Sequence, residues 1–558
     1  MLASTVPYFL CAQVAGARHF MWLTYNLDDS CVYLSWMRQA ADGSSHALNL
    51  FTTEPQHGML LNPFFWVLGR AAKFTGLSLI SVYQGARVVC GFTLLMVTVT
   101  LIRATVQNAL AQRLAFLFVC FSSGLGWLPF WWNAAQNALP IDTWQPEAIT
   151  FLSLYLSPLF CFSMTLQVAI VTLLFRGEQT GRARYAVLGG VCGLLLALTH
   201  TYDVLSLAAV WSLYLVLPWK PDPPFKSRAH RMATGWTQAI IASLTTVPGV
   251  AYIYREIKTE SVFAQRAAVP TLTPPLQWVL IGFGLTLLLA IVGAAATLQA
   301  EKATAEPAQK YDSTARSPTL LLIAWAFANI AISYAPVAFQ RKMLQGTHLP
   351  VSLLAGIGVA WILLHPTSQV KTRQLTLASV LCIIILSVTN ITFVMRDIRN
   401  AFENRVQTGM HRPFINPGEL DALQWIRLHT EPGTAFQPLP WVFVDNLNHK
   451  KGSSDVTIAC FGPGLTGRPV YCGHWGETPH YGDKLNYIMN TFSPNISDAE
   501  RSNRLRNMQV RYLLFSQKAL SDTAPDLLMS MFRGHSPLPS YLKLQYSNSD
   551  ADIYEIKL

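Results

Sequence analysis

The sequence predicts an all-α polytopic membrane protein with a small α/β domain at its C-terminal end. Hydrophobic residues make up 51% of the 558 residues and charged residues only 13%, a composition typical of membrane-embedded chains. Largely uncharged segments of about 15 to 25 residues recur as far as Met395, close to the roughly 20 residues that a helix needs to cross the hydrocarbon core. From about Arg396 the pattern changes to mixed polar and apolar residues, as expected for a domain outside the bilayer.

The apolar segments predict a bundle of about eleven transmembrane helices. The N-terminal run 2–14 is short for a complete span and lacks the positive n-region and the cleavage site of a signal peptide. We therefore expect a first helix that is incomplete at its start. The other helices are predicted at 79–103, 112–131, 153–175, 185–199, 202–217, 236–254, 277–299, 318–336, 348–364 and 374–396.

The distribution of charge predicts the orientation of the bundle. The formal net charge is +11, but Lys and Arg fall mostly in short loops, and no basic patch interleaved with aromatic residues suggests a nucleic-acid partner. With the N-terminus in the cytoplasm, every cytoplasmic loop contains Lys or Arg, whereas the outer loop 132–150 contains neither. The first outer loop, about 18–78, and all residues after Met395 then lie outside the cytoplasm of a bacterial-type inner or plasma membrane. The basic residues of the cytoplasmic loops are Arg103, Arg113, Arg176, Arg182, Arg184, Lys220, Lys226, Arg228, Arg231, Lys302, Lys310, Arg316, Lys371 and Arg373.

We divide the chain into a membrane domain, 1–396, and an extracytoplasmic α/β domain, 397–558. In the second domain, Pro417 starts a capped amphipathic helix predicted at 417–426. Short runs rich in β-branched and aromatic residues predict strands. These strands are expected at 441–444, 456–459, 510–515 and 552–556.

The nine cysteines are scattered, and most lie inside apolar runs, where cysteine behaves as a small hydrophobic residue. Cys460 and Cys472 could pair in an oxidising compartment, although a reduced pair is the more common outcome. The sequence has no CxxC motif and no Cys/His ligand spacing, so it predicts no zinc site.

The acidic pair Asp28-Asp29 lies just after the first apolar run, near the bilayer surface. Carboxylates crowded at such a position are costly, which indicates chemistry rather than packing. The alternative is helix capping, because Asp favours the first turn of a helix and an amphipathic stretch follows at 32–40.

Glu54 and His57 lie in the same outer loop, next to an amphipathic segment, 61–74, that is expected to lie flat at the interface. Together with Asp29 they form a candidate ligand set for a divalent cation, Mg or Mn, bound to phosphate oxygens. The alternatives are a simple turn for Glu54 and a solvated side chain for His57.

Arg341 and Lys342 lie in a loop that the topology places outside, where short loops otherwise avoid positive charge. Paired cations at the membrane surface suggest a phosphate site, because Arg binds phosphate in a bidentate manner and Lys acts as a point charge. The alternative is anchoring to lipid headgroups. Arg87 is expected about two turns inside the outer end of the second helix, where it either faces a polar cavity or an acidic partner, or snorkels outward.

His200, Tyr202 and Asp203 interrupt a long apolar stretch, as expected for a helical hairpin whose tip lies outside. Polar groups at such a tip would line the mouth of a cavity. The alternative is an ordinary turn in which Asp203 caps the second helix.

The segment 471–481 is dense in aromatic and ionisable side chains, including His474, Trp475 and Glu477. Such a loop can stack on a sugar ring and form hydrogen bonds with its hydroxyl groups. The alternative is a connecting loop that packs the C-terminal domain onto the membrane part.

The early acidic pair, the amphipathic outer loop, the helix bundle and the extracytoplasmic domain resemble the GT-C superfamily of membrane glycosyltransferases. This superfamily includes protein O-mannosyltransferases, oligosaccharyltransferases and lipid A aminoarabinose transferases. The chain is also similar to uncharacterised bacterial proteins grouped with that superfamily, over the stretches 28–40, 49–55, 340–350 and 473–481.

The resemblance implies transfer of a hexose or pentose from a polyprenyl-phosphate carrier to a lipid, glycan or protein acceptor on the outer side, with inversion. Asp28 or Asp29 would be the general base. Arg341, with Lys342 or Arg87, would neutralise the departing phosphate. The alternatives are a transporter or flippase of a lipid-linked substrate, for which the two halves show no matching Gly/Pro-interrupted helices, and a non-catalytic envelope scaffold.

Overall fold

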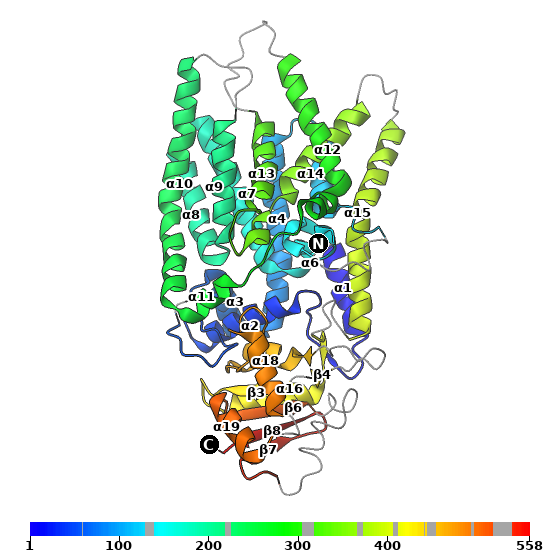
Figure 1. Ribbon diagram of the computed structural model, residues 1–558. Helices are drawn as coiled ribbons and strands as arrows, with labels where there is room; N and C mark the ends of the chain where they lie inside the picture. Colours follow the sequence, from blue (N-terminus) through cyan, green and yellow to red (C-terminus); the bar gives the residue numbers. More distant parts are fainter. Residues whose placement is uncertain are drawn as a thin grey trace. The chain divides into compact units, whose positions relative to one another are not determined.

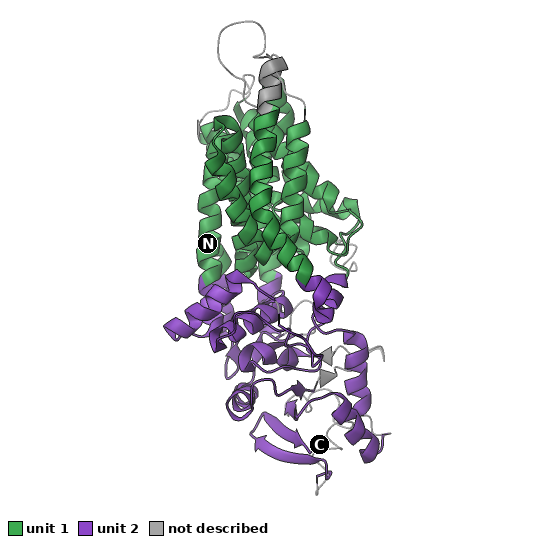
Figure 2. Cartoon of the chain, turned by 90° about the vertical axis from the view of Figure 1, so that its left-hand side faces the viewer, with its two compact units in different colours: residues 1–5, 86–255, 270–395 green, residues 6–85, 256–269, 396–558 purple. Residues whose placement is uncertain are grey.

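The structure of the protein is a computed structural model that divides into two compact units (Figure 2). Unit 1 comprises residues 1–5, 86–255 and 270–395. Unit 2 comprises residues 6–85, 256–269 and 396–558. The structure describes residues 1–58, 60–128, 139–217, 225–303, 317–364, 372–404, 411–439, 441–442, 454–492, 496–516 and 538–557.

Unit 1 is built from apolar helices (Figure 1). Among the described residues, five helices are long and apolar enough to cross a membrane, and four shorter ones are also apolar. The chain is therefore an integral membrane protein, and the predicted number of eleven spans stays a prediction. The helices are α4 (Leu79–Thr105), α5 (Ala109–Phe121), α6 (Thr150–Leu156), α7 (Pro158–Thr180), α8 (Ala183–Thr199), α9 (Tyr202–Val216), α10 (Phe225–Thr259), α12 (Leu276–Ala303), α13 (Pro318–Ile332), α14 (His348–Leu364) and α15 (Thr372–Phe402), with the 3-10 turns η3 (Ile141–Thr143), η4 (Pro146–Ala148) and η5 (Gln340–Leu344).

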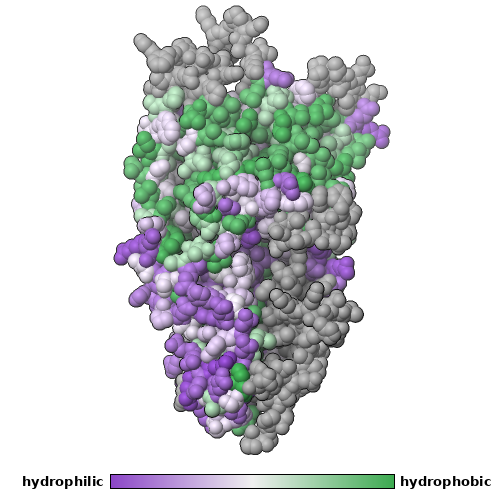
Figure 3. Space-filling model, in the orientation of Figure 1, coloured by the Kyte–Doolittle hydropathy of each residue, from purple (hydrophilic) through white to green (hydrophobic). Residues whose placement is uncertain are grey.

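Helix α14 lies in the core of unit 1, where small residues allow close packing. Gly293 and Gly358 leave no room for a side chain, because a Cβ on either would collide with the backbone of the facing helix, α14 or α12. Such contacts are typical of helices that pack in a membrane. Figure 3 shows hydrophobic side chains over the outer surface of the helices of unit 1, as expected for contact with lipid. Exposed examples are Phe92, Leu188, Leu244, Leu288, Phe327 and Leu381.

Two predicted helices end differently in the structure. The predicted helix 153–175 is divided into α6 and α7, because Ser157 is extended and precedes Pro158, and a residue before proline disfavours the helical conformation. The predicted helix 112–131 ends earlier, at Phe121, and residues 129–131 lie outside the described residues. Residues 132–138 of the outer loop 132–150 and the basic residues Lys220, Lys310, Arg316 and Lys371 also lie outside them.

Unit 2 contains a four-stranded sheet of order β3-β6-β8-β7, in which β3 is parallel to β6 and the other pairs are antiparallel. Its apolar core includes Leu513, Phe515 and Tyr554. The strands of the sheet are β3 (Phe436–Pro438), β6 (Tyr512–Ser516), β7 (Leu542–Ser547) and β8 (Ala551–Ile556), and the C-terminal helices are α16 (Pro417–His429), α17 (Thr457–Thr466), α18 (Tyr481–Thr491) and α19 (Asp498–Asn507).

The first outer loop packs with the C-terminal segment in unit 2, although the sequence assigned it to the membrane domain. Strand β1 (His19–Phe20) pairs with β2 (Phe414–Ile415), so the two segments share a ribbon. Helix α2 (Leu27–Asp42) packs against α17 so closely that a Cβ at Gly464 would lie 2.9 Å from the Cβ of Leu34. The other elements of this unit are α1 (Leu2–Gln13), which begins in unit 1, α3 (Pro63–Thr75), α11 (Ser261–Ala268), β4 (Trp441–Val442) and β5 (Ser454–Asp455).

Most predicted elements of the C-terminal domain are confirmed. Helix α16 begins at Pro417, and the carboxylate of Glu419 accepts the backbone N–H of Asn416 at 2.9 Å. Strands β6 and β8 match the predicted runs 510–515 and 552–556. Only 441–442 of the predicted strand 441–444 are described, as β4.

The strand predicted at 456–459 is wrong, because these residues enter helix α17. A short apolar run has no periodicity that separates a strand from a buried helix. Cys460 and Cys472 are not paired, in line with the more common outcome expected from the sequence, since all nine cysteines are free.

Candidate functional site

The acidic pair occupies the first turn of α2 in unit 2, and its two members have different partners. Asn26 precedes the helix in a left-handed conformation (φ 55°), and its side-chain Nδ2 donates to Asp29 Oδ2 at 2.9 Å. Asp28 Oδ2 accepts instead from the indole Nε1 of Trp475 at 2.7 Å. Asp29 therefore serves the local helix start, and Asp28 is the member that reaches the loop 471–481.

The surroundings of Asp28 keep its half-buried carboxylate ionised. Burial acts to raise its pKa, but the electrostatic influence of His474 and His411 and the hydrogen bond from Trp475 outweigh burial and lower the pKa below its ordinary value. Asp28 is therefore deprotonated at neutral pH. A deprotonated carboxylate of this kind can accept a proton from a hydroxyl or amide group.

His474 presents a hydrogen-bond donor in the same loop. Its Nδ1 accepts the backbone N–H groups of Gly476 and Glu477, both at 3.0 Å, so this geometry assigns the ring proton to Nε2. The ring is 2% exposed, and within the described residues its Nε2 makes no hydrogen bond. Phe51 and Trp475 pack around it, with ring centroids 5.5 Å and 6.1 Å away.

Glu477 is tied to helix α11 by an ion pair. Arg266 Nε lies 2.7 Å from Glu477 Oε1, and its guanidinium carbon lies 5.2 Å from the centroid of the Trp36 ring. Arg266 thus links α2, α11 and the loop 471–481. The sequence contained a signal for it, because the predicted topology places Arg266, like Arg341, in an outer loop where positive charge is unusual.

The three predicted metal ligands have three different protein partners. Glu54 Oε1 binds the ammonium group of Lys484 at 2.7 Å, and His57 Nδ1 lies 3.1 Å from Glu260 Oε1. Asp29 is held by Asn26. Among the described residues, no group of three His, Cys, Asp or Glu side chains could hold a metal ion. The residues predicted as ligands thus do not fit a divalent-cation site.

The predicted cations Arg341 and Lys342 lie in η5 of unit 1, where aromatic rings hold them. The guanidinium carbon of Arg341 lies 5.3 Å from the Trp144 centroid, and its nearest carboxylate contact is a long one, 3.9 Å to Glu147. The ammonium group of Lys342 lies 5.5 Å from the Tyr202 centroid. Aromatic faces leave the positive charge uncompensated, which suits an anionic ligand. Neither Trp144 nor Glu147 is among the site residues predicted from the sequence.

Arg87 is buried in unit 1 and bound by the backbone. Its Nη1 donates to the carbonyl oxygens of Ser4 and Leu154, both at 3.0 Å, and its side chain is 1% exposed. These contacts show that it does not snorkel outward. They join α4 to the first residues of the chain and to α6, and a phosphate-binding role for Arg87 stays a prediction.

His200 and Asp203 lie at the predicted hairpin, since α8 ends at Thr199 and α9 begins at Tyr202. Asp203 is completely buried, with its Oδ2 3.0 Å from His200 Nδ1 and 3.0 Å from the donating Nε2 of Gln345. These two residues therefore belong to a buried network of unit 1. Tyr202 is the member of this trio that contacts a predicted cation, Lys342.

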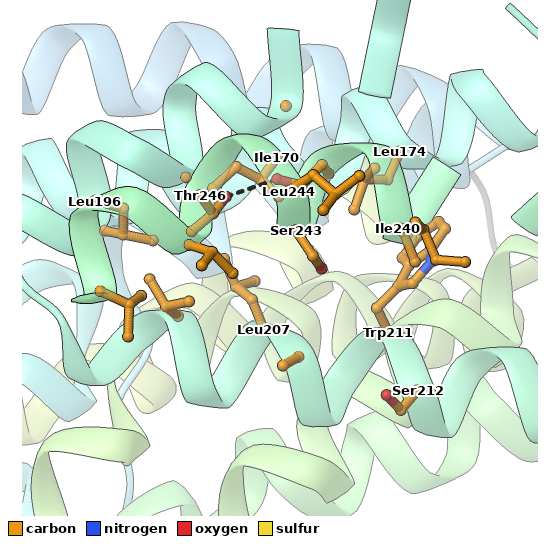
Figure 4. A pocket seen from close by; sticks show the side chains of 18 of the residues that line it. Ile170, Leu174, Leu196, Leu207, Trp211, Ser212, Ile240, Ser243, Leu244 and Thr246 are labelled. Carbon is orange, nitrogen blue, oxygen red and sulfur yellow. Dashed lines mark hydrogen bonds between the residues drawn. The ribbon is translucent and has the colours of Figure 1, made fainter. Parts of the chain in front are cut away.

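An apolar cavity of about 620 Å³ lies between helices α7, α8, α9 and α10 of unit 1 (Figure 4). Leucine, isoleucine, valine and alanine side chains form most of its wall, together with the two tryptophans Trp211 and Trp236. Its size and chemistry suit a hydrocarbon chain.

Comparison with known proteins establishes the fold. No protein-family model matches the sequence, and no curated protein matches it. The structure is similar to ArnT from Cupriavidus metallidurans in the apo state, with a TM-score of 0.51 and 12% identity, over 99% of this chain and 96% of that chain. It is also similar to the archaeal oligosaccharyltransferase AglB from Archaeoglobus fulgidus, in complex with an inhibitory peptide and a dolichol-phosphate, with a TM-score of 0.50 and 11% identity, over 97% of this chain and 72% of that chain. The chain therefore shares the overall fold of these two proteins.

Proposed function

We propose that the protein is a membrane glycosyltransferase that moves a sugar from a polyprenyl-phosphate carrier to an acceptor on the extracytoplasmic side, with Asp28 as general base. The observation that carries the proposal is the ionised Asp28 carboxylate, which accepts a hydrogen bond from the indole of Trp475 and is kept ionised by that bond together with the electrostatic influence of His474 and His411. The GT-C fold supports it, since both similar structures are glycosyltransferases.

In the proposed reaction, a hydroxyl or amide group of the acceptor attacks the anomeric carbon of the donor sugar. The new glycosidic bond forms as the bond between the anomeric carbon and the phosphate oxygen breaks, and the electron pair leaves with the phosphate. Asp28 takes the proton of the acceptor. A direct displacement of this kind inverts the configuration at the anomeric carbon.

His474 and Trp475 would orient the sugar or the acceptor. The Nε2–H of His474 can donate to a hydroxyl group, and the half-exposed Trp475 ring offers a face for stacking. Aromatic stacking with hydrogen bonds at the ring edge is a common way to bind a carbohydrate.

Arg341 and Lys342 would neutralise the charge that develops on the departing lipid phosphate. Preorganised cations act strongly on developing charge in a site that excludes water. The apolar cavity in unit 1 suits the isoprenoid chain of the carrier. The dolichol-phosphate bound to the archaeal oligosaccharyltransferase supports a lipid-linked donor.

The proposal is tested with the full chain reconstituted in liposomes and a panel of synthetic polyprenyl-phosphate hexoses and pentoses. The measurement is release of free polyprenyl phosphate, with crude envelope glycolipid, glycan and protein fractions as acceptors. Release that depends on both a donor and an acceptor fraction supports a transferase. Movement of an intact donor between leaflets without release would indicate a flippase instead, and neither activity would indicate a scaffold.

A further inference from the structure

A group of buried polar side chains in unit 1 directly follows the cations of η5 in the chain. The Nε2 of Gln345 donates to Asp203 Oδ2 at 3.0 Å and also contacts the hydroxyl of Ser163. The Nδ2 of Asn329 donates to the backbone carbonyl of Gln345 at 3.0 Å. The Oε1 of Gln167 lies against Gly346, where it leaves no room for a side chain. We call this group the polar cluster; it comes from α7, α9, α13 and the turn between η5 and α14 (Figure 1).

The polar cluster contains five side-chain oxygens that form no hydrogen bond within the described residues, and their residues are all at most 1% exposed. These atoms are Asp203 Oδ1, Asn329 Oδ1, Gln345 Oε1, Gln167 Oε1 and Thr347 Oγ1. The amide nitrogen Nε2 of Gln167 likewise makes no hydrogen bond within the described residues, so the cluster holds one unpaired donor beside these oxygens. Burying an oxygen that accepts no hydrogen bond costs free energy in an apolar interior. Such a set of oxygens therefore points to a bound hydrogen-bond donor or ion.

The charge of the cluster indicates which kind of ligand it takes. Asp203 is its only carboxylate, and the other four oxygens belong to neutral amide and hydroxyl groups. His200 Nδ1 lies 3.0 Å from Asp203 Oδ2 but lacks the geometry of a hydrogen bond. One carboxylate with neutral oxygens balances one positive charge, whereas sites for divalent cations usually contain several carboxylates.

We propose that the polar cluster binds a single alkali cation, for which Na⁺ is the natural probe, and that this cation fixes the turn that follows Arg341 and Lys342. The oxygens come from three helices and the turn, so a cation among them would join these elements. The proposal is independent of the transferase activity, because it rests only on buried oxygens and their charge.

The test uses the purified full chain in detergent, with NaCl replacing choline chloride at constant ionic strength. Thermal unfolding is followed by tryptophan fluorescence, and binding is measured with ²²Na⁺. Because a ligand that binds only the folded state stabilises it, we expect Tm to rise by about 2–5 °C and then saturate, with one Na⁺ bound per chain. The same Tm in sodium, potassium, lithium and choline, with no bound ²²Na⁺, would overturn the proposal and leave ordered water as the donor.

Two variants locate the ion. Asp203→Asn should abolish both the Tm response and ²²Na⁺ binding, whereas Asn329→Ala, which keeps the charge, should weaken binding about tenfold. If Asp203→Asn does not fold, the Na⁺ affinity of Asn329→Ala is compared with that of the wild type instead. An unchanged affinity would contradict a cation site at the polar cluster. Asp142→Asn is the matched control, because Asp142 is a completely buried carboxylate of the same unit that accepts the backbone N–H groups of Gly124 and Gly126. It should keep the full sodium response.

Discussion

The two units compensate their charged side chains in different ways. In unit 2 the predicted acids Glu54 and Glu477 are paired with cations, Lys484 and Arg266. In unit 1 the predicted cations Arg341 and Lys342 lie on aromatic rings, with at most a long contact to a carboxylate. The cations of unit 1 are therefore more available to a charged ligand than the paired acids of unit 2.

Asp28 and Asp29 differ from these acids, because neither has an ion pair within the part of the chain that the structure describes. Asp28 accepts a hydrogen bond from a neutral indole, and the electrostatic influence of His474 and His411 also helps to keep its carboxylate ionised. The proposed reaction needs both this anion and the cations of η5.

Asp28→Asn should lower the transfer rate by about 10²–10⁴-fold, because an amide cannot accept the proton of the acceptor. Asp29→Asn should cost less than about tenfold, since Asp29 contacts Asn26 at the helix start and a cap contributes stability rather than chemistry. Initial rates of polyprenyl phosphate release, with the folded fraction measured for each variant, separate the two. Near wild-type rates for both variants would show that neither carboxylate is the base.

Arg341→Ala should lower kcat by about 10²–10³-fold, the effect of removing one preorganised contact to a developing charge. Arg341→Lys should recover part of this loss, because it keeps the charge but not the bidentate geometry. Arg511→Ala is the matched control, since Arg511 is an exposed arginine that pairs with Glu555 in unit 2. Equal rates for Arg341→Ala and Arg511→Ala would contradict a role in phosphate binding.

Trp475→Phe should move the acid limb of the pH–rate profile to higher pH. The indole hydrogen bond helps to keep the pKa of Asp28 below its ordinary value, so removing it raises that pKa and protonates the base at a higher pH. For the same reason, the stability that Asp28 contributes in the wild type is present above its unfolded-state pKa and is lost as pH falls through its folded-state pKa.

The measurement for this prediction is kcat/KM from about pH 3 to 8, a range that begins below the ordinary pKa of an aspartate, about 3.9. Trp425→Phe serves as the control, because Trp425 stacks on His429 in α16 and has no contact with Asp28 among the described interactions. If the acid limb of the Trp475→Phe profile stays at the same pH as in the wild type, although the rate is lower, Trp475 contributes packing or stacking alone.

The Arg266–Glu477 ion pair should contribute the smallest effect, a coupling of about 0.5–1 kcal/mol to stability, because Arg266 is 31% exposed and solvent screens the pair. A double-mutant cycle with Arg266→Ala and Glu477→Gln, followed by thermal unfolding, measures this coupling. A value near zero would remove the distinction drawn between paired acids in unit 2 and Asp28.

The fold could be predicted from the sequence where periodicity and capping were strong. The apolar segments became helices, and the runs near 512 and 552, rich in β-branched and aromatic residues, became paired strands. The strand predicted at 456–459 was wrong because a run of four residues, three of them apolar, fits both a strand and a buried helix.

The candidate site could be predicted in kind but not in detail. The position of Asp28-Asp29 indicated chemistry, yet which Asp carries it depends on Trp475, which is 447 residues away in the sequence. Similarly, Arg341 of η5 could be recognised from the sequence because it lies in a predicted outer loop, where positive charge is unusual. Its contacts with Trp144 and Glu147 depend on tertiary packing. Local sequence carries no information on such contacts.

The contact between Asp28 and Trp475 also has a consequence for biosynthesis. Asp28 is synthesised 447 residues before Trp475, so the chain must grow to residue 475 before the indole that helps to lower the pKa of Asp28 exists. A polypeptide that is still being synthesised, or one that is released before residue 475, therefore holds the acid without this partner. On the proposed mechanism, activity begins only after residue 475 has been translated and folded into place, so shorter products consume no carrier lipid.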